Sequence, residues 1–227
     1  TGAMFGHSPA AVAAKLAEES TRGYTAMLPT AAAAVAGQAL TERFGLPYWQ
    51  LATTATDANR FVVRWARAIT QRKKILVFNG CYHGTIDDVF VDIDPSSGKR
   101  VTRTSLLGQV YDLTQFTDVV EFNDISAVRA KLASKEFACV LTEPALTNCG
   151  MVLPEDGFLA QLREACDATD TLLVFDETHT ISAGYAGYTG LCYFLPDMIV
   201  AGKAIAGGLP CAVYGMSAEV AARMRAA

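Results

Sequence analysis

Lys203 stands in the stretch VAGKAIAGGLP, after an apolar run and before a glycine-rich turn. It is the only lysine or arginine between Arg163 and Arg223, and a solvated surface charge needs no such setting. Asp176 and Glu177 directly follow the apolar stretch TLLVF, where a carboxylate is costly to bury without a partner. The first chemistry that the sequence suggests is therefore a reactive amine together with a buried carboxylate.

Apolar strand-like segments alternate with amphipathic helix-like segments along most of the chain. Strands are expected at Tyr48–Ala52, Lys74–Phe78, Val119–Phe122, Phe137–Thr142, Thr171–Phe175, Met198–Ala201 and Ala212–Tyr214, and helices at Ser8–Arg22, Thr30–Phe44, Thr56–Thr70, Ser126–Ser134, Gly157–Thr169 and Ser217–Ala226. The polar stretch Asp94–Thr117 is expected to be an exposed excursion. This alternation predicts an α/β fold, with a mostly parallel sheet sandwiched by helices. In such sheets ligands bind beyond the carboxyl ends of the strands.

Further residues at the predicted strand ends are suited to ligand binding. Thr53–Asp57 follows one strand and opens a helix, whose free N–H groups suit a phosphate. Asn79–Gly84 brings an aromatic ring and an imidazole after the next strand, and Glu143 follows another, with Asn148 shortly after it. One cofactor, pyridoxal 5′-phosphate (PLP), explains the set. Its aldehyde needs a lysine, its pyridine nitrogen a carboxylate, its phosphate a helix N-terminus and its ring an aromatic face.

Five motifs carry a resemblance to a known family, in the family's order and over most of the chain. They are TTATDANR (Thr53–Arg60), YHG (Tyr82–Gly84), EPALTNCG (Glu143–Gly150), FDETHT (Phe175–Thr180) and PDMIVAGKAIAGGLP (Pro196–Pro210). The chain resembles the large PLP-binding domain of the class III aminotransferases, which are fold-type I PLP-dependent enzymes and include glutamate-1-semialdehyde aminomutase and the ω-aminotransferases. The lead-in GAMFGHSP (Gly2–Pro9) also resembles that of the family.

The resemblance implies a role for individual residues. Lys203 would form the Schiff base with the cofactor, and Asp176 would pair with its pyridine nitrogen. Thr54, Ala55 and Thr56 would form the turn that binds the phosphate, and Tyr82 would stack on the cofactor ring. Asn148 would lie near the ring hydroxyl, and Thr178 would pack on the other face of the ring. His83, next to Tyr82 in the YHG motif, is expected to hydrogen-bond within the cofactor site.

Some positions depart from the pattern of the family. Ala55 replaces the usual glycine of the phosphate turn, and a positive φ there would strain the backbone. Thr178 puts a hydroxyl where valine is common. His179 is expected to form hydrogen bonds rather than to act as a catalytic base. Glu143 could hold a loop or contact the cofactor, and Glu177 is expected to be structural. The spacing of the histidines fits no metal motif, so no metal is expected.

By this resemblance the expected activity is a PLP-dependent amino-group transfer. The substrates would be an amine or amino acid and a keto acid or aldehyde. An intramolecular aminomutase, of the glutamate-1-semialdehyde type, would use the same residues and stays open. A non-catalytic structural or binding module on the same fold is the alternative from another class. A nucleotide-phosphate loop at GKAIAGG does not fit, because the lysine precedes the glycine pair and no Ser or Thr follows it.

Composition limits the class of protein and its partners. The chain has 227 residues, 51% hydrophobic and 19% charged, with a formal net charge of −4. No apolar run approaches the roughly 20 residues of a membrane helix, and the basic residues are scattered, so neither a membrane nor a nucleic acid is expected as a partner. The six cysteines form no CxxC pair and no secretory signal is visible, so we expect a cytoplasmic protein. From the resemblance, residues 1–227 would be the large domain of a homodimer, with an N-terminal segment and a small C-terminal domain outside them.

Overall fold

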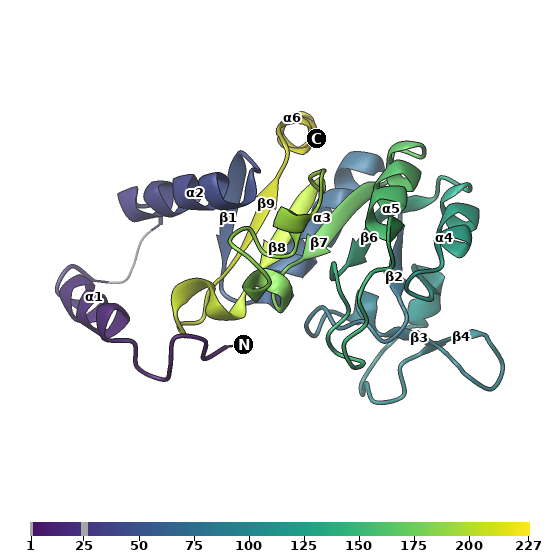
Figure 1. Ribbon diagram of the computed structural model, residues 1–227, viewed down its shortest axis with the longest axis horizontal. Helices are drawn as coiled ribbons and strands as arrows, with labels where there is room; N and C mark the ends of the chain where they lie inside the picture. Colours follow the sequence, from purple (N-terminus) through teal and green to yellow (C-terminus); the bar gives the residue numbers. More distant parts are fainter. Residues whose placement is uncertain (1, 24–26) are drawn as a thin grey trace.

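The central sheet of the computed structural model has seven strands, in the order β1-β9-β8-β7-β6-β2-β5 (Figure 1). The structure describes residues 2–23 and 27–227. The strands are β1 (Tyr48–Ala52), β2 (Lys74–Phe78), β5 (Thr117–Val120), β6 (Phe137–Thr142), β7 (Leu172–Asp176), β8 (Met198–Ala201) and β9 (Ala212–Met216). From β8 to β5 all neighbours are parallel, whereas β9 runs antiparallel to β8 and β1. The predicted α/β fold with a mostly parallel sheet is confirmed.

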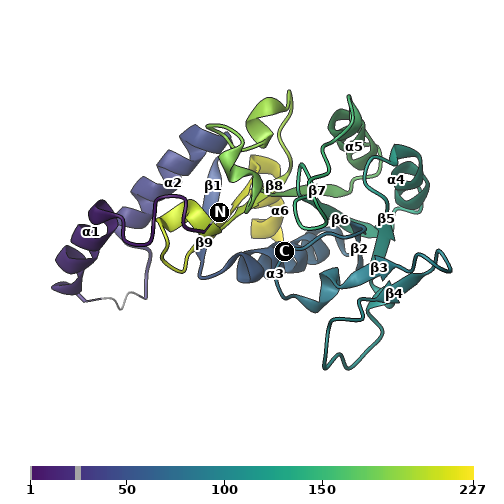
Figure 2. The same ribbon diagram turned by 60° about the horizontal axis from the view of Figure 1, so that its bottom comes forward.

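Helices cover both faces of the sheet. They are α1 (Ala10–Ser20), α2 (Ala31–Phe44), α3 (Ala55–Thr70), α4 (Ile125–Leu132), α5 (Phe158–Asp167) and α6 (Ala218–Ala226). On one face α3 and α6 bury their apolar side chains, and on the other α4 and α5 pack on β2, β6 and β7 while α2 packs on β8 and β9. Figure 2 shows α1 at one end of the molecule and α4 and α5 at the other. No side chain of α1 is buried.

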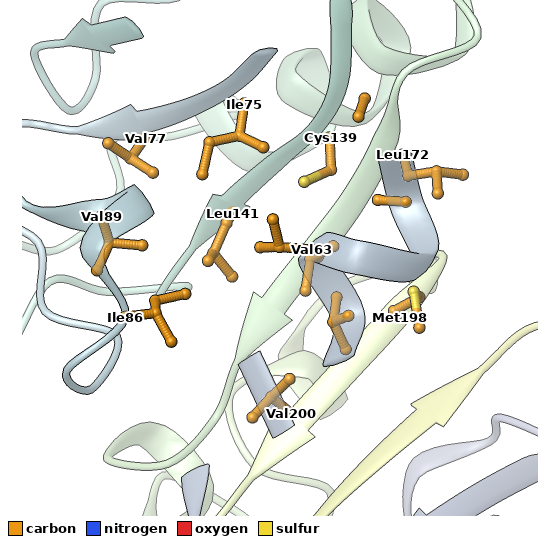
Figure 3. Close-up of a cluster of buried hydrophobic side chains, with 14 of the residues drawn as sticks. Val63, Ile75, Val77, Ile86, Val89, Cys139, Leu141, Leu172, Met198 and Val200 are labelled. Atoms are coloured by element: carbon orange, nitrogen blue, oxygen red, sulfur yellow. The ribbon is translucent and has the colours of Figure 1, made fainter. Parts of the chain in front are cut away.

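The core between α3 and the sheet is made mostly of aliphatic side chains (Figure 3). Val63 of α3 lies over Leu141 and Cys139 of β6, with Ile75 of β2 and Val200 of β8 on either side. Each of these side chains is at most 1% exposed. Burial of this kind stabilises a protein by about 25 cal/mol for each Å² of apolar surface removed from water. The core therefore holds the strand ends, and the residues that follow them, in fixed relative positions.

Local sequence explains where the key helix begins. The hydroxyl of Thr54 accepts a hydrogen bond from the N–H of Asp57 at 3.1 Å, so Thr54 is the N-cap of α3. The helix thus starts at Ala55, one residue before the predicted start. The predicted strand at Val119–Phe122 lies two residues earlier. The expected excursion begins in the turn of a short hairpin and includes its second strand, since β3 (Val91–Ile93) precedes Asp94 and β4 (Arg100–Thr102) follows it.

The helices carry no sign of a membrane span. Among residues 2–23 and 27–227, no helix is both long enough and apolar enough to cross a bilayer.

Candidate active site

A cavity of about 550 Å³ opens at the carboxyl edge of the parallel strands. It collects residues that follow different strands: Thr53 after β1, Tyr82 after β2, Glu143 after β6 and Lys203 after β8. Of the residues predicted from the sequence, its walls include Thr54, Ala55, Thr56, Tyr82, Asp176, Thr178 and Lys203. These residues span the sequence from 54 to 203, so the fold alone brings them together.

Lys203 lies in this cavity on a strained turn. Its φ of 50° is in the left-handed region, which a residue with a Cβ rarely adopts. Such strain costs about 1–3 kcal/mol and persists only where the surrounding structure enforces it, which is typical of functional sites. Gly202 allows the close approach, since a Cβ there would lie 2.9 Å from the Cβ of Ala55. The turn is therefore pressed against the start of α3, with the half-buried lysine beside it.

Ala55 does not carry the strain that its replacement of glycine suggested. It is the first residue of α3 and is not among the residues with a positive φ. A helical conformation suits alanine well, so the expected distortion of this turn is wrong. The methyl group instead packs against Gly202.

Asp176 ends β7 and is 3% exposed. Its Oδ2 accepts hydrogen bonds from Asn59 Nδ2 and from the His83 ring, both at 2.9 Å, and its Oδ1 accepts one from the Thr178 N–H at 3.0 Å. Burial alone would raise the pKa of this carboxyl, but the hydrogen bonds from His83, Thr178 and Asn59 outweigh it and hold the pKa below its usual value. Asp176 is therefore ionised at the bottom of the cavity.

His83 lies behind Asp176 and not in the cavity wall. It is 1% exposed, and its Nδ1 contacts the Asp176 carboxylate. Burial alone would lower the pKa of His83, but the hydrogen bond to Asp176, with Cys81 nearby, raises it to about 10. The two residues thus form a buried ion pair, and a cofactor in the cavity would meet His83 only through Asp176. Asn59 completes this arrangement by also donating to the His83 carbonyl oxygen at 3.2 Å.

The N-terminus of α3 leaves backbone donors free at the cavity. Thr54 caps the N–H of Asp57, whereas the N–H groups of Ala55 and Thr56 have no partner within the helix. The hydroxyl oxygen of Thr56 accepts from the N–H of Thr85 at 3.1 Å, so its own proton stays available for an acceptor. This is a set of donors, at the positive end of a helix dipole, that suits an anion such as a phosphate.

Tyr82 and Thr178 contribute to other walls of the cavity. Tyr82 is held by packing on the core and by an edge contact with Phe90, whose ring centroid is 6.5 Å away. Thr178 is 7% exposed, and its buried hydroxyl has no hydrogen-bond partner among the described residues. A buried hydroxyl without a partner costs about 1–3 kcal/mol, so Thr178 Oγ1 is suited to contact a bound molecule.

Asn148 does not lie in this cavity, contrary to the prediction. The residue is exposed and borders a separate depression with Asn79 and Arg103. The reason is the pair of backbone hydrogen bonds between Leu146 and Val152, which closes a short hairpin. Asn148 lies at the exposed tip of this hairpin.

Glu143 and His179 line the cavity, although the sequence assigned them no definite role. Both contact Thr147, which sequence reasoning missed. Glu177 has a structural role, because its fully buried carboxylate accepts hydrogen bonds from Thr180, Tyr188 and Thr189 and so holds the following loop. Asn59 and Thr147 are single polar residues within the motifs. Only their contacts with Asp176 and His179, which are distant in the sequence, mark them as parts of the site.

The lead-in to α1 also reaches the site. Residues Gly2, Ala3, Gly6 and His7 contribute to the walls of the cavity. Gly208, Leu209, Pro210 and Cys211 also contribute to its walls. The glycine-rich turn after Lys203 is therefore part of the site, although Gly208, Leu209 and Pro210 are also exposed.

The fold and the site define an α/β protein whose cavity can hold a phosphate, a protonated ring nitrogen and a lysine-bound group. The chain belongs to the class III aminotransferases, since the family model for Aminotransferase class-III matches residues 2–227. The resemblance found in the sequence is confirmed.

Similar proteins agree with this family. A glutamate-1-semialdehyde 2,1-aminomutase of Francisella philomiragia is 36% identical over 170 residues, which are 74% of this chain and 39% of that protein. A glutamate-1-semialdehyde aminomutase structure from Pseudomonas aeruginosa, in complex with PMP, superposes with a TM-score of 0.95 at 49% identity, covering 99% of this chain and 49% of that one. An ω-transaminase structure from Sphaerobacter thermophilus superposes with a TM-score of 0.90 at 29% identity, covering 97% of this chain and 52% of that one. The chain thus spans about half the length of these structures and less than half of the curated relative.

Proposed function

We propose that the protein is a PLP-dependent aminotransferase that moves an amino group between an amine or amino acid and a keto acid or aldehyde. The observation that carries this proposal is that Lys203 and the ionised Asp176 line one cavity. Residues 1–227 would be the large cofactor-binding domain. The cofactor would supply an aldehyde that bonds to amines and a protonated ring that takes up the electron pair released at the substrate carbon.

The residues of the cavity fit such a cofactor in their chemistry. Lys203 would give the amine that bonds to the aldehyde, and, once displaced by substrate, would move the proton at the amine-bearing carbon. Asp176 would keep the ring nitrogen protonated by its negative charge. The N–H groups of Ala55 and Thr56 and the Thr56 hydroxyl would bind the phosphate, while Thr54 fixes the helix start that presents them. Tyr82 and Thr178 would confine the ring between them.

An absorption spectrum tests this proposal. The full-length protein with added PLP is expected to show a visible band that borohydride removes, with the cofactor retained on the peptide containing Lys203. Lys203→Ala should lose both the band and the labelled peptide, whereas Lys99→Ala, a lysine exposed on the β3–β4 turn, should keep them. A wild-type protein without the band would contradict the enzyme assignment and favour a non-catalytic module on this fold.

An aminomutase is the second candidate, and it is favoured by the 49% identity to the Pseudomonas aeruginosa aminomutase. It would use the same residues but return the amino group to the same molecule. The two candidates differ in their need for a second substrate. Conversion of glutamate 1-semialdehyde alone to its isomer would establish the aminomutase, whereas turnover that requires a separate amine and a separate carbonyl compound would establish the aminotransferase.

We also propose a cytoplasmic homodimer. All six cysteines are free thiols, as expected in a reducing compartment. Exposed apolar side chains border a groove between α2 and β1, and surfaces of this kind commonly mark interfaces; they include Met27 (95% exposed), Leu28 (80%) and Leu51 (53%). Light scattering on the full-length protein should give twice the monomer mass, and Leu51→Glu should lower it.

A further inference from the structure

Arg103 follows β4 and joins the β3–β4 hairpin to the turn that carries Tyr82. Its Nη2 donates a hydrogen bond to the Cys81 carbonyl oxygen at 2.9 Å. Its Nε and Nη2 also donate to the two carboxylate oxygens of Asp92 on β3, at 2.8 and 2.6 Å. Bidentate pairs of this kind are strong and fix the plane of the guanidinium. The roles proposed above use neither Arg103 nor Asp92.

The Cys81 carbonyl group needs this donor because the residue is removed from water. Cys81 is fully buried, and a buried carbonyl oxygen without a hydrogen-bond donor is costly. Arg103 therefore holds the backbone at the residue directly before Tyr82. At the other end of the turn, the N–H of Thr85 donates to the Thr56 hydroxyl oxygen at 3.1 Å. The turn is thus anchored on both sides of Tyr82.

A second contact links Arg103 to the ring of Tyr82. The guanidinium carbon lies 5.4 Å from the centroid of the Phe90 ring, within the range of a cation–π interaction. Phe90 is 7% exposed, and its ring meets that of Tyr82 at an angle of 71°, with the centroids 6.5 Å apart. Arg103 thus supports both the backbone before Tyr82 and the ring that packs against it.

Arg103 lies outside the cavity that it supports. Tyr82 and Gly84 line the cavity, whereas Arg103 and Asp92 border the separate depression that holds Asn148. The side chain of Arg103 is 14% exposed, so it is also largely shielded from solvent. Any influence of Arg103 on a molecule in the cavity therefore passes through the turn.

We propose that Arg103 is a positioning residue for the cofactor. By holding Cys81 and Phe90, it fixes the orientation in which the Tyr82 ring faces the cavity. Asp92 orients the guanidinium through the bidentate pair. The inference rests on the proposed function, because it assumes that PLP lies against Tyr82.

Arg103→Lys tests this role, with Arg67→Lys as a matched control. A lysine keeps the charge but presents one compact ammonium group, which cannot reproduce the planar fork of an arginine. Arg67 also bonds one carboxylate and one carbonyl oxygen, those of Asp88 and Lys73, at 2.6 and 2.8 Å. It lies in the last turn of α3, at the end away from the cavity.

The measurements are made on the full-length protein with PLP. A lost hydrogen bond of about 1.4 kcal/mol corresponds to a tenfold change in an equilibrium constant. We expect Arg103→Lys to raise the Kd for PLP about tenfold. It should also reduce the visible circular dichroism of the bound cofactor at saturation, because that signal depends on how the ring is held. Arg67→Lys should lower the thermal unfolding temperature to a similar extent but keep the wild-type Kd and circular dichroism.

A second measurement asks whether Tyr82 transmits the effect. In a Tyr82→Ala background the ring that Arg103 supports is gone, so Arg103→Lys should raise the Kd much less than it does in the wild-type background. Asp92→Asn, which keeps the shape of the side chain but weakens its pair with Arg103, should reproduce part of the loss of affinity. If Arg103→Lys does not fold, Asp92→Asn takes its place in the same comparison.

Three results would overturn the proposal. One is an Arg103→Lys variant with wild-type Kd and circular dichroism. Another is an equal rise in Kd in Arg103→Lys and Arg67→Lys, since that pattern belongs to a general loss of stability. The third is the same rise in Kd with and without the Tyr82 ring. Failure of the proposed function is distinct from all three, because the wild-type protein itself would then lack the band that borohydride removes.

Discussion

At the scale of single residues, the charge of Asp176 depends on neighbours that never reach the cavity. Asn59 is fully buried and donates to both the Asp176 carboxylate and the His83 carbonyl. Replacing it by leucine, of similar size, leaves both acceptors short of a donor in a dry site. We expect Asn59→Leu to lower the free energy of unfolding by about 1–3 kcal/mol and to weaken PLP binding. Urea titration and cofactor titration measure the two effects.

Asn148→Ala is the matched control for that substitution. Asn148 is exposed and outside the cavity, so its removal should change stability by less than about 0.5 kcal/mol and leave PLP binding unchanged. A loss of cofactor affinity in Asn148→Ala would show that the cavity extends to the hairpin tip after β6.

The ion pair of His83 and Asp176 makes stability depend on pH. The pKa of His83 is about 10 in the folded protein, whereas a free histidine titrates near pH 6.5. The folded state therefore keeps a proton that the unfolded chain loses, so the stabilisation is complete below about pH 6.5 and disappears as pH rises through 10. We expect the free energy of unfolding to fall across this window.

Urea unfolding at several pH values between 6.5 and 10 measures this dependence. Comparison with His83→Gln isolates the ion pair from the other groups that titrate in the window, because the variant lacks the proton in question. Parallel pH profiles for the two proteins would show that His83 is not charged in the folded state.

At the scale of elements, the start of α3 and the turn after β2 fit together through a glycine. Gly84 has a φ of +82°, and a Cβ there would lie 2.2 Å from the Thr56 hydroxyl oxygen. Gly84→Ala must therefore displace the α3 N-terminus as well as strain its own backbone. We expect it to cost about 1–2 kcal/mol for the backbone alone, with a further loss and weaker PLP binding from the displacement.

Gly98→Ala separates the two contributions. Gly98 also has a positive φ, of +66°, but nothing lies within 4 Å of the added Cβ. Its cost should be that of the backbone alone, as measured by urea unfolding, with PLP affinity unchanged. Equal losses of stability and equal PLP affinities for Gly84→Ala and Gly98→Ala would mean that the start of α3 accommodates the added Cβ next to Thr56.

The elements also show what the sequence could predict. The buried strands β2, β6 and β8 have the predicted bounds, because an apolar run is a local signal, and so does the largely exposed edge strand β1. β5 begins two residues earlier, at Thr117-Asp118, which reads as polar. Its buried polar groups are satisfied by distant residues: Thr117 donates to the Asp88 carbonyl at 2.6 Å, and Lys131 pairs with Asp118 at 3.1 Å. Such partners cannot be predicted from a local pattern.

The same distinction holds for the candidate site. Lys203, Asp176 and the α3 start follow strands directly, so the parallel sheet alone places them at one edge. Asn148 was misplaced because its position depends on a hairpin rather than on a strand end. The contacts of Asn59 with Asp176 and of Thr147 with His179 join segments far apart in the chain, and no spacing rule predicts them.

At the scale of the whole molecule, the cysteines lie in different parts of the fold and differ in how deeply they are buried. Cys139 and Cys166 are fully buried, and burial raises the pKa of both thiols, that of Cys139 to about 12. Cys149 is exposed, whereas Cys211 is partly buried in the wall of the cavity. Because the thiolate is the form that reacts, burial slows alkylation both by covering the sulfur and by keeping it protonated.

Alkylation by iodoacetamide at pH 8, followed by peptide mass spectrometry, should therefore modify Cys149 first and Cys139 and Cys166 only after unfolding in urea. Bound PLP should slow the modification of Cys211 and leave that of Cys149 unchanged, because only the former lies in the cavity. This locates the cofactor without any measurement of turnover. Equal protection of Cys149 and Cys211 would place the cofactor elsewhere or indicate a change over the whole molecule, and it would contradict the site at the carboxyl edge of the sheet.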